Sequence, residues 1–201
     1  MIVHALLLLL CLPLVVAIHE LGHFWCARVL RIPLAEFSFG MGPVLRQWQT
    51  KETRFTIHLW PIAAHVRPVV VKGGAGSLDQ RLIQNCSLWV QILFLAGGAI
   101  ANLASAYSVL LLRGMGSDRP VEGMANALPQ FWQLVGVVGD RFLSLVSWER
   151  SSVGLPPMDV LQQIAFLSLS FGLINLLPVP PFDGGRIFVI LLRTSGTIKL
   201  R

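Results

Sequence analysis

His19, Glu20 and His23 are the residues of this sequence best spaced for chemistry, and they lie in the pentapeptide His-Glu-Leu-Gly-His. Residues four apart share one face of an α-helix, so both imidazoles can bind a single metal ion while Glu20 projects beside them. Two histidines and a third protein ligand leave one position open for water, whose pKa a bound zinc ion lowers to about 7. The pattern predicts a hydrolytic zinc centre in which Glu20 accepts the water proton, although so short a pattern also arises by chance.

The composition places this pattern in a membrane. Hydrophobic residues make up 54% of the 201 residues and charged residues only 13%, and the mean hydropathy is +0.68. These values are too apolar for a soluble domain of this length. The formal charge of +6 comes from basic residues scattered between apolar runs, which argues against a nucleic-acid-binding face. Ionisable groups within an apolar membrane segment are costly and are functional candidates by default, so a chance occurrence of the pattern is disfavoured.

Asp183 is the carboxylate that can complete the metal site. It lies in a segment, residues 175–185, that follows an apolar run and contains three prolines. Because prolines cannot continue a regular helix, the freed backbone groups must be satisfied by protein, water or ligand. A carboxylate on such a broken membrane segment is the predicted third ligand beside His19 and His23.

Apolar runs of membrane length must position these residues, and the sequence predicts three spanning helices: 2–30, which carries the histidine pair, 88–112 and 160–177. At 1.5 Å per residue the first is long enough to cross a hydrocarbon core of about 30 Å. A cleaved signal peptide ending near Ala17 is the alternative. However, no Lys or Arg precedes the apolar run, and the run continues into the histidine pair, so a retained helix is favoured.

Two further elements are predicted between the spans. Residues 34–72 alternate with a two-residue period around a turn at 40–43, as is typical of a β-hairpin or small sheet. Its unpaired edge either accepts an extended peptide as an added strand or belongs to a merely structural loop. Residues 124–148, approximately, have apolar side chains at helical spacing, which predicts an amphipathic interfacial helix.

Several isolated residues receive structural assignments. His58 and His65 are assigned to the hairpin or the membrane interface, with a peripheral metal-binding role as the alternative. The three cysteines, which show no CxxC spacing, are assigned to packing: Cys11, Cys26 and Cys86. Asn102 is a lone amide that follows the segment 97–101, whose glycines and alanines permit close approach of helices. Its side chain either forms a hydrogen bond between helices or helps to hold substrate or orient the site, and the sequence leaves both alternatives open.

The distribution of charge predicts the orientation of the chain. Residues 28–81 contain eight Lys or Arg against three Asp or Glu, residues 184–201 contain four against none, and residues 113–159 contain four against five. The positive-inside bias therefore places the hairpin and the C-terminal segment in the cytosol. The predicted metal ligands then lie toward the cytosolic ends of the first and third spans.

Together, the HELGH pentapeptide, the hairpin region, the glycine-rich helix with Asn102 and the segment 175–185 resemble the site-2 protease family of intramembrane metalloproteases. The resemblance covers nearly the whole chain as one domain, 1–201. It implies a polytopic α-helical membrane protein and a metalloendopeptidase that binds zinc through His19, His23 and Asp183, with Glu20 as general base and acid. It also implies substrate-binding roles for Asn102 and Asn175.

The resemblance further implies membrane lipid and a transmembrane protein or peptide as partners. The expected activity is hydrolysis of peptide bonds in or near transmembrane segments, in regulated intramembrane proteolysis or in the clearance of signal-peptide remnants. The expected location is the bacterial inner (cytoplasmic) membrane, with the active site toward the cytosol. The chain departs from many bacterial members because only residues 113–120 stand where PDZ domains are inserted, and because too few residues follow Asp183 for another full span.

A function from another class also fits these residues. The chain could be a catalytically inactive zinc-binding membrane protein that acts as a substrate-binding or regulatory module, which predicts bound metal without turnover. A metal transporter is disfavoured, because a single site provides no chain of ligands across the bilayer.

Overall fold

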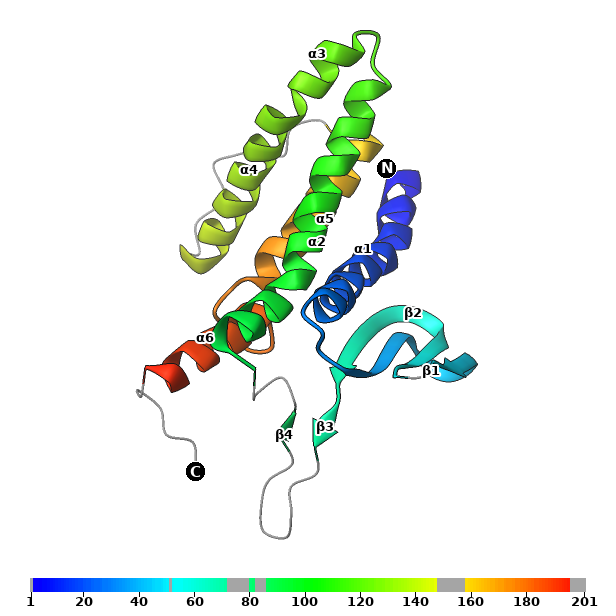
Figure 1. Ribbon diagram of the computed structural model, residues 1–201. Coiled ribbons are helices and arrows are strands. Elements are labelled where there is room, and N and C mark those ends of the chain that lie inside the picture. The colour runs from blue at the N-terminus through cyan, green and yellow to red at the C-terminus, as the bar shows by residue number, and fades with distance from the viewer. Residues whose placement is uncertain (1, 51, 72–79, 82–85, 148–157, 196–201) are drawn as a thin grey trace.

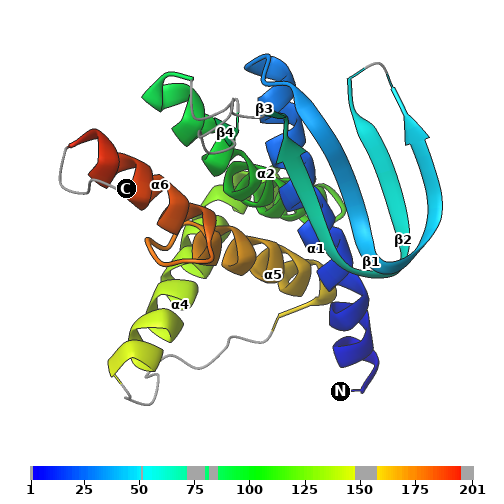
Figure 2. The same ribbon diagram turned by 90° about the horizontal axis from the view of Figure 1, so that it is seen from below.

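Three helices that lie side by side, α1 (Ile2–Val29), α2 (Leu88–Met115) and α5 (Val160–Asn175), form the body of the molecule (Figure 1). The computed structural model describes residues 2–50, 52–71, 80–81, 86–147 and 158–195. The remaining elements are β1 (Leu34–Gln49), β2 (Arg54–Pro68), β3 (Val70–Val71), β4 (Gln80–Arg81), α3 (Pro120–Ala125), α4 (Ala127–Ser147) and α6 (Asp183–Thr194). The β1–β2 hairpin and α6 lie at the same end of the molecule, beside the C-terminal end of α1 (Figures 1 and 2).

Within the described residues, two helices are long and apolar enough to cross a membrane: Leu10–Val29 and Leu88–Met115. The third expected span, α5, is shorter than predicted, because its 16 residues correspond to a length of about 24 Å. The helix ends at Asn175, where Leu176 begins a turn that leads into the proline-containing segment. The number of spans therefore stays a prediction.

Small residues bring α1 and α2 into close contact. A Cβ atom on Gly22 would overlap the carbonyl oxygen of Gly97, and one on Gly97 would lie 2.6 Å from Sγ of Cys26. Such contacts let two helix backbones approach each other. As a result, the face of α1 that carries the two histidines is held against α2. Cys26 packs in this contact as a free thiol.

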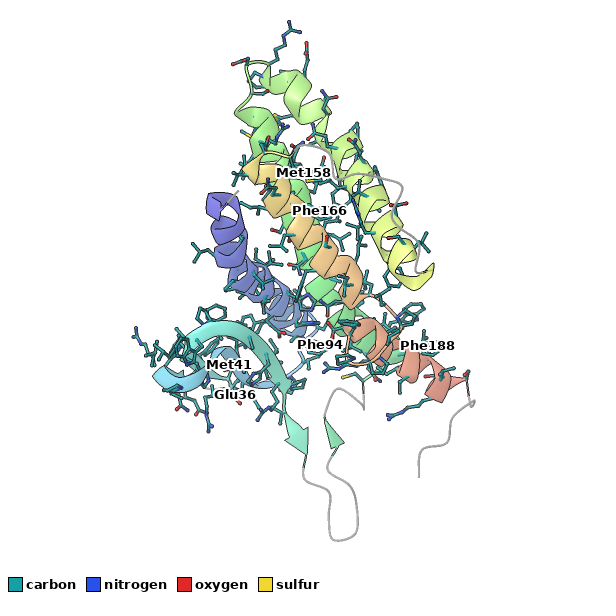
Figure 3. The ribbon with its side chains drawn as sticks, turned by 180° about the vertical axis from the view of Figure 1, so that it is seen from behind. Glu36, Met41, Phe94, Met158, Phe166 and Phe188 are labelled. Carbon is teal, nitrogen blue, oxygen red and sulfur yellow. The ribbon has the colours of Figure 1, made fainter. Side chains whose placement is uncertain are left out.

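The largest apolar core lies between α2, α4 and α5. The helix predicted at about 124–148 is α4, and Trp148 lies outside the described residues. Its apolar stripe faces the core, whereas Trp132 and Leu143 are exposed, as expected of an amphipathic helix. Met158 and Phe166 pack against the core near α5 (Figure 3). The buried members are Ala106, Leu110, Ala127, Phe131, Leu134, Val138, Ala165 and Leu169.

The β1–β2 hairpin is strongly curled. Residues 36–39 of β1 pair on one side with residues 64–67 of β2 and on the other side with residues 54–57 of β2. Residues 54–58 also pair with residues 44–49, the second half of β1. The turn predicted at residues 40–43 is a bend inside β1, and the reversal between the strands lies at 50–53. The bend requires glycine, because Gly40 and Gly42 have φ angles of +89° and +87°. Residues 64–67 are left at one edge of the curled sheet.

Asp159 fixes the start of α5. Its carboxylate accepts the Gln162 N–H at 2.9 Å, the Gln162 side chain accepts the Asp159 N–H at 3.2 Å, and Arg113 of α2 donates to the second carboxylate oxygen. Replacing Asp159 with Ala is expected to lower the free energy of unfolding by about 1 kcal/mol, because this capping interaction is lost. Chemical unfolding of the purified protein in detergent measures the loss, and the exposed Asp118→Ala is the control.

This contribution depends on pH in a definite direction. Burial raises the pKa of Asp159, but the Gln162 N–H and the Arg113 guanidinium outweigh it and hold the pKa below its ordinary value of 3.8. A group with a lowered pKa stabilises the fold fully above the unfolded value and loses its effect as pH falls through the folded value. The stability difference between wild type and Asp159→Ala should therefore shrink below about pH 4. A difference that grows there would contradict this assignment.

Candidate metal centre

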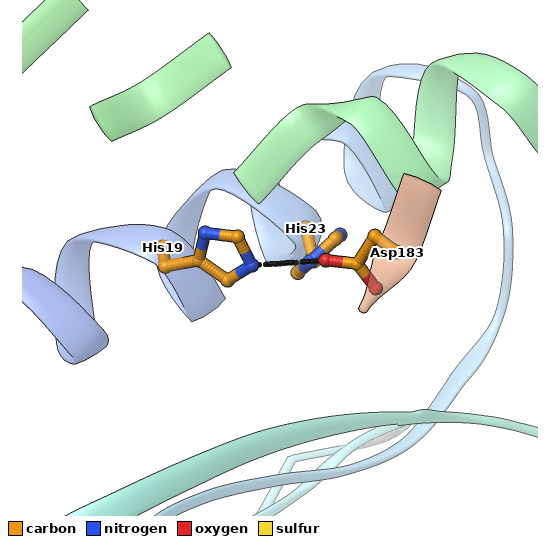
Figure 4. Close-up of side chains that lie close together, drawn as sticks. All are labelled: His19, His23 and Asp183. Carbon is orange, nitrogen blue, oxygen red and sulfur yellow. Dashed lines mark hydrogen bonds and ion pairs between the residues drawn. The ribbon is translucent and has the colours of Figure 1, made fainter. Parts of the chain in front are cut away.

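His19, His23 and Asp183, the three predicted ligands, meet in one buried group (Figure 4). Oδ2 of Asp183 lies 3.0 Å from Nε2 of His19 and 3.1 Å from Nε2 of His23, and the two Nε2 atoms are 3.2 Å apart. All three residues are at most 7% exposed. The i,i+4 spacing on α1 places the two imidazoles, and the first residue of α6 places the carboxylate.

The hydrogen bonds around these atoms fit a bound cation. Nδ1 of His23 lies 2.8 Å from the carbonyl oxygen of Phe94, so this nitrogen donates its proton to α2. Because a neutral imidazole has one N–H, Nε2 of His23 is then a lone-pair acceptor that faces the Asp183 carboxylate, another acceptor. Ligands about 2.0–2.1 Å from a tetrahedral zinc ion are about 3.3 Å from one another, close to the distances found here. The three residues can therefore hold a metal ion.

Glu20 lies beside this group at a cavity of about 370 Å³ that also reaches the edge of β2. Its carboxylate accepts the backbone N–H of Val66. Arg186, on α6, approaches the other oxygen of Asp183 at 3.5 Å, which leaves Oδ2 directed at the histidines. The cavity is lined by Glu20, His23, Ala64, His65, Val66, Arg67, Phe94, Leu95, Asp183 and Arg186.

Gly98 provides the space in which the imidazoles lie. A Cβ atom at this position would be 2.5 Å from Nε2 of His19 and 2.6 Å from Nε2 of His23. Real Cβ atoms do not approach other atoms so closely, so any larger residue would displace the two nitrogens. The glycine in α2 is therefore part of the shape of the site.

The two asparagines predicted to bind substrate are placed differently. Asn102 is fully buried, and its side chain lies 3.2 Å from Nδ1 of His19, so it forms a contact between α2 and α1 at the predicted metal ligand. Asn175 is half-buried at the end of α5 and donates its amide to the carbonyl oxygen of Phe171 at 2.9 Å. The structure thus brings Asn102, and not Asn175, into contact with the predicted ligands.

The arrangement agrees with a comparison with known protein families. The sequence model of peptidase family M50 matches residues 7–200. This chain belongs to peptidase family M50. The match includes every residue of the candidate metal centre.

Individual M50 relatives are similar over parts of their length. A protein of Nostoc, provisionally named a zinc metalloprotease, is 33% identical over 157 residues, which are 75% of this chain and 39% of the relative. A protein of Fusobacterium nucleatum with the same kind of name is 30% identical over 124 residues, 61% of this chain and 35% of the relative. Protease RseP of Yersinia pestis is 30% identical over 121 residues, 57% of this chain and 27% of the relative. The chain thus spans less than half the length of these relatives.

Several groups at this M50 site were not predicted from the sequence. The glycines and alanines of residues 97–101 were expected to permit close helix packing, but the contact between Gly98 and the imidazoles depends on how α1 and α2 face each other. The carbonyl of Phe94 and the N–H of Val66 are backbone groups, so no side-chain pattern indicates them. Ser168, which contacts Asn102 from α5, carried no signal of its own.

Proposed function

We propose that this M50 chain is a zinc metalloprotease that hydrolyses peptide bonds in or beside transmembrane segments of membrane proteins. The buried convergence of His19, His23 and Asp183 carries the proposal. Two further observations support it: Glu20 lies at the same cavity, and the histidines are on a helix apolar enough to cross a membrane. The names of the M50 relatives point to zinc as the metal.

In this proposal each residue has a defined role. His19, His23 and Asp183 would hold a zinc ion, which when bound would supply an acidified water and polarise the scissile carbonyl. Glu20 accepts the proton of the attacking water and later returns it to the nitrogen of the leaving amine. The N–H of Val66 holds the Glu20 carboxylate at the cavity, and Arg186 orients Asp183.

The edge of β2 supports a mode of substrate binding. A transmembrane helix hides its carbonyls in internal hydrogen bonds, so the substrate must be unwound locally before attack. Residues 64–67 form one edge of the curled sheet and also line the cavity beside Glu20. An extended peptide added to this edge would pass in front of the metal site. Asn175 would meet such a peptide through its side-chain oxygen or the second N–H of its amide, since one N–H is donated to the carbonyl oxygen of Phe171.

The proposed setting is the bacterial inner membrane, with α5 as a third span and the site toward the cytosol. The basic residues on α6 and on the hairpin support this orientation. The exposed apolar side chains of the hairpin support contact with lipid; they include Met41, Leu45 and Trp60.

Removal of the metal tests the proposal. We expect the purified protein in detergent to cleave a single-span model substrate, to lose this activity after treatment with a zinc chelator, and to recover it when one equivalent of zinc is returned. Cleavage that persists in a sample shown to be free of metal would contradict the proposal. Bound zinc without cleavage across a panel of single-span substrates would favour the inactive binding module instead.

A further inference from the structure

Asn102 joins the metal centre to a third helix. Its backbone oxygen lies 3.1 Å from Oγ of Ser168 on α5, and its side-chain oxygen lies 3.4 Å from the same hydroxyl. The other end of the amide lies 3.2 Å from Nδ1 of His19. Asn102 and Ser168 are 0% and 1% exposed, so solvent does not compete for these contacts. Gly172 of α5 leaves room for the Asn102 side chain, because a Cβ atom on Gly172 would lie only 3.1 Å from the Cβ atom of Asn102.

The orientation of the Asn102 amide determines which nitrogen of His19 carries a proton. When the NH₂ group faces His19, Nδ1 must be an acceptor, and the single ring proton lies on Nε2. That proton points to Oδ2 of Asp183, 3.0 Å away. In this arrangement Nε2 of His19 donates its proton to the Asp183 carboxylate and has no lone pair to offer a metal.

The reversed amide gives the opposite result. The side-chain oxygen of Asn102 then accepts a proton from Nδ1 of His19, and Nε2 becomes a lone-pair ligand. The NH₂ group now faces Ser168, whose hydroxyl accepts from it while donating its own proton to the Asn102 backbone carbonyl. Asn102, Ser168 and Nδ1 of His19 each keep a partner, because a hydroxyl both donates and accepts. The two amide orientations occupy the same space, and neighbouring groups decide between them.

His23 has no such freedom. Its Nδ1 faces the carbonyl oxygen of Phe94, which can only accept, so the neutral imidazole of His23 keeps its lone pair on Nε2. The Nδ1 atoms of the two histidines therefore have different partners. His23 faces a backbone carbonyl, which can only accept, and His19 faces the Asn102 amide, which can either donate or accept.

We propose that Asn102 and Ser168 are positioning residues that set the tautomer of His19, and that the amide reverses when the site takes up its metal. This inference rests on the proposed function, because it assumes a metal at the site. Groups that hold the second nitrogen of a metal-binding histidine change metal affinity by about 10- to 100-fold. Ser168 acts through Asn102, and Asn102 acts through His19.

Zinc affinity of the purified protein, measured by competition with a fluorescent chelator, tests the inference without an activity assay. We expect Asn102→Leu and Ser168→Ala each to weaken zinc binding by about 10- to 100-fold. Ser170→Ala is the matched control, since Ser170 is on the same helix and bonds only to the Phe166 carbonyl among the contacts of the described chain. Affinities of Asn102→Leu and Ser168→Ala within about twofold of this control would overturn the proposal.

A measurement on the wild-type protein remains decisive if a variant fails to fold. Nitrogen-15 NMR of the five histidines reports the tautomer of each, and the signals of His19 are those lost in His19→Asn. We expect a proton on Nε2 of His19 in the metal-free protein and on Nδ1 in the zinc-loaded protein. A proton on Nδ1 in both forms would overturn the reversal. If wild type binds no zinc at all, the proposed function fails as well; if wild type binds zinc and the variants match it, only this inference fails.

Discussion

Glu20→Gln is expected to reduce peptide cleavage by about 10²- to 10⁴-fold while the protein keeps its zinc. The substitution preserves the shape of the side chain but removes the group that accepts the proton of water. Glu20 is not one of the three ligands, so the metal should remain. Zinc content and the initial rate of cleavage of a single-span substrate, measured on the same preparation, check both parts of the prediction.

Glu122→Gln is the matched control for this experiment. Glu122 is an exposed carboxylate on α3, where it pairs only with Arg119 among the contacts of the described residues. Its replacement should leave both zinc content and cleavage unchanged. If Glu20→Gln cleaves at a rate close to that of Glu122→Gln, Glu20 is not the general base and the proposed roles must be reassigned.

Gly98→Ala should abolish metal binding without unfolding the protein. The added Cβ would lie 2.5 and 2.6 Å from the two nitrogens that face Asp183. The two helices are also in close contact at the neighbouring residue, where a Cβ on Gly97 would lie 2.6 Å from Sγ of Cys26 of α1. We expect zinc affinity to fall by more than about 100-fold, as two of the three ligands are displaced, and cleavage to fall with it.

Gly136→Ala provides the comparison for the helix itself. Gly136 lies in α4, and a new Cβ there would meet no described atom within 4 Å apart from its chain neighbours and the backbone of its own helix. Alanine is favoured over glycine within a helix by about 1 kcal/mol, so this variant should be slightly more stable and should bind zinc normally. Normal zinc binding by Gly98→Ala would show that the imidazoles do not occupy the position found here.

Two kinds of feature made parts of the site predictable from the sequence. One is the local spacing of residues along a helix, and the other is an ionisable side chain in an otherwise apolar segment. The four-residue spacing of His19 and His23 fixes their shared face in any helix. Asp183 is 164 residues from His19, so no local spacing relates them. A carboxylate at membrane depth is costly unless a cation or a hydrogen-bond donor contacts it. Asp183 was predicted to be a ligand for this reason. The approximate extents of α1 and α2 followed from long apolar runs in the same way, although α2 continues beyond the predicted end at Leu112 to Met115.

The parts that were not predictable depend on how distant elements meet. Gly98 and Ser168 are ordinary small residues of apolar helices until α1, α2 and α5 pack together. The curl of the hairpin requires the bend at Gly40 and Gly42, and the sequence indicated only a turn. The length of α5 was overestimated because residues after Asn175 are apolar, although they do not continue the helix.

X-ray absorption spectroscopy of the purified, zinc-loaded protein tests whether His19, His23 and Asp183 bind the metal, because it reports which atoms surround the zinc. We expect a four-coordinate zinc with nitrogen and oxygen neighbours at about 2.0–2.2 Å, including the outer-shell scattering of two imidazoles. This scattering should fall in His19→Asn and in His23→Asn. A sulfur neighbour at about 2.3 Å, or a spectrum without imidazole scattering, would show that the metal binds elsewhere and that these residues are not its ligands.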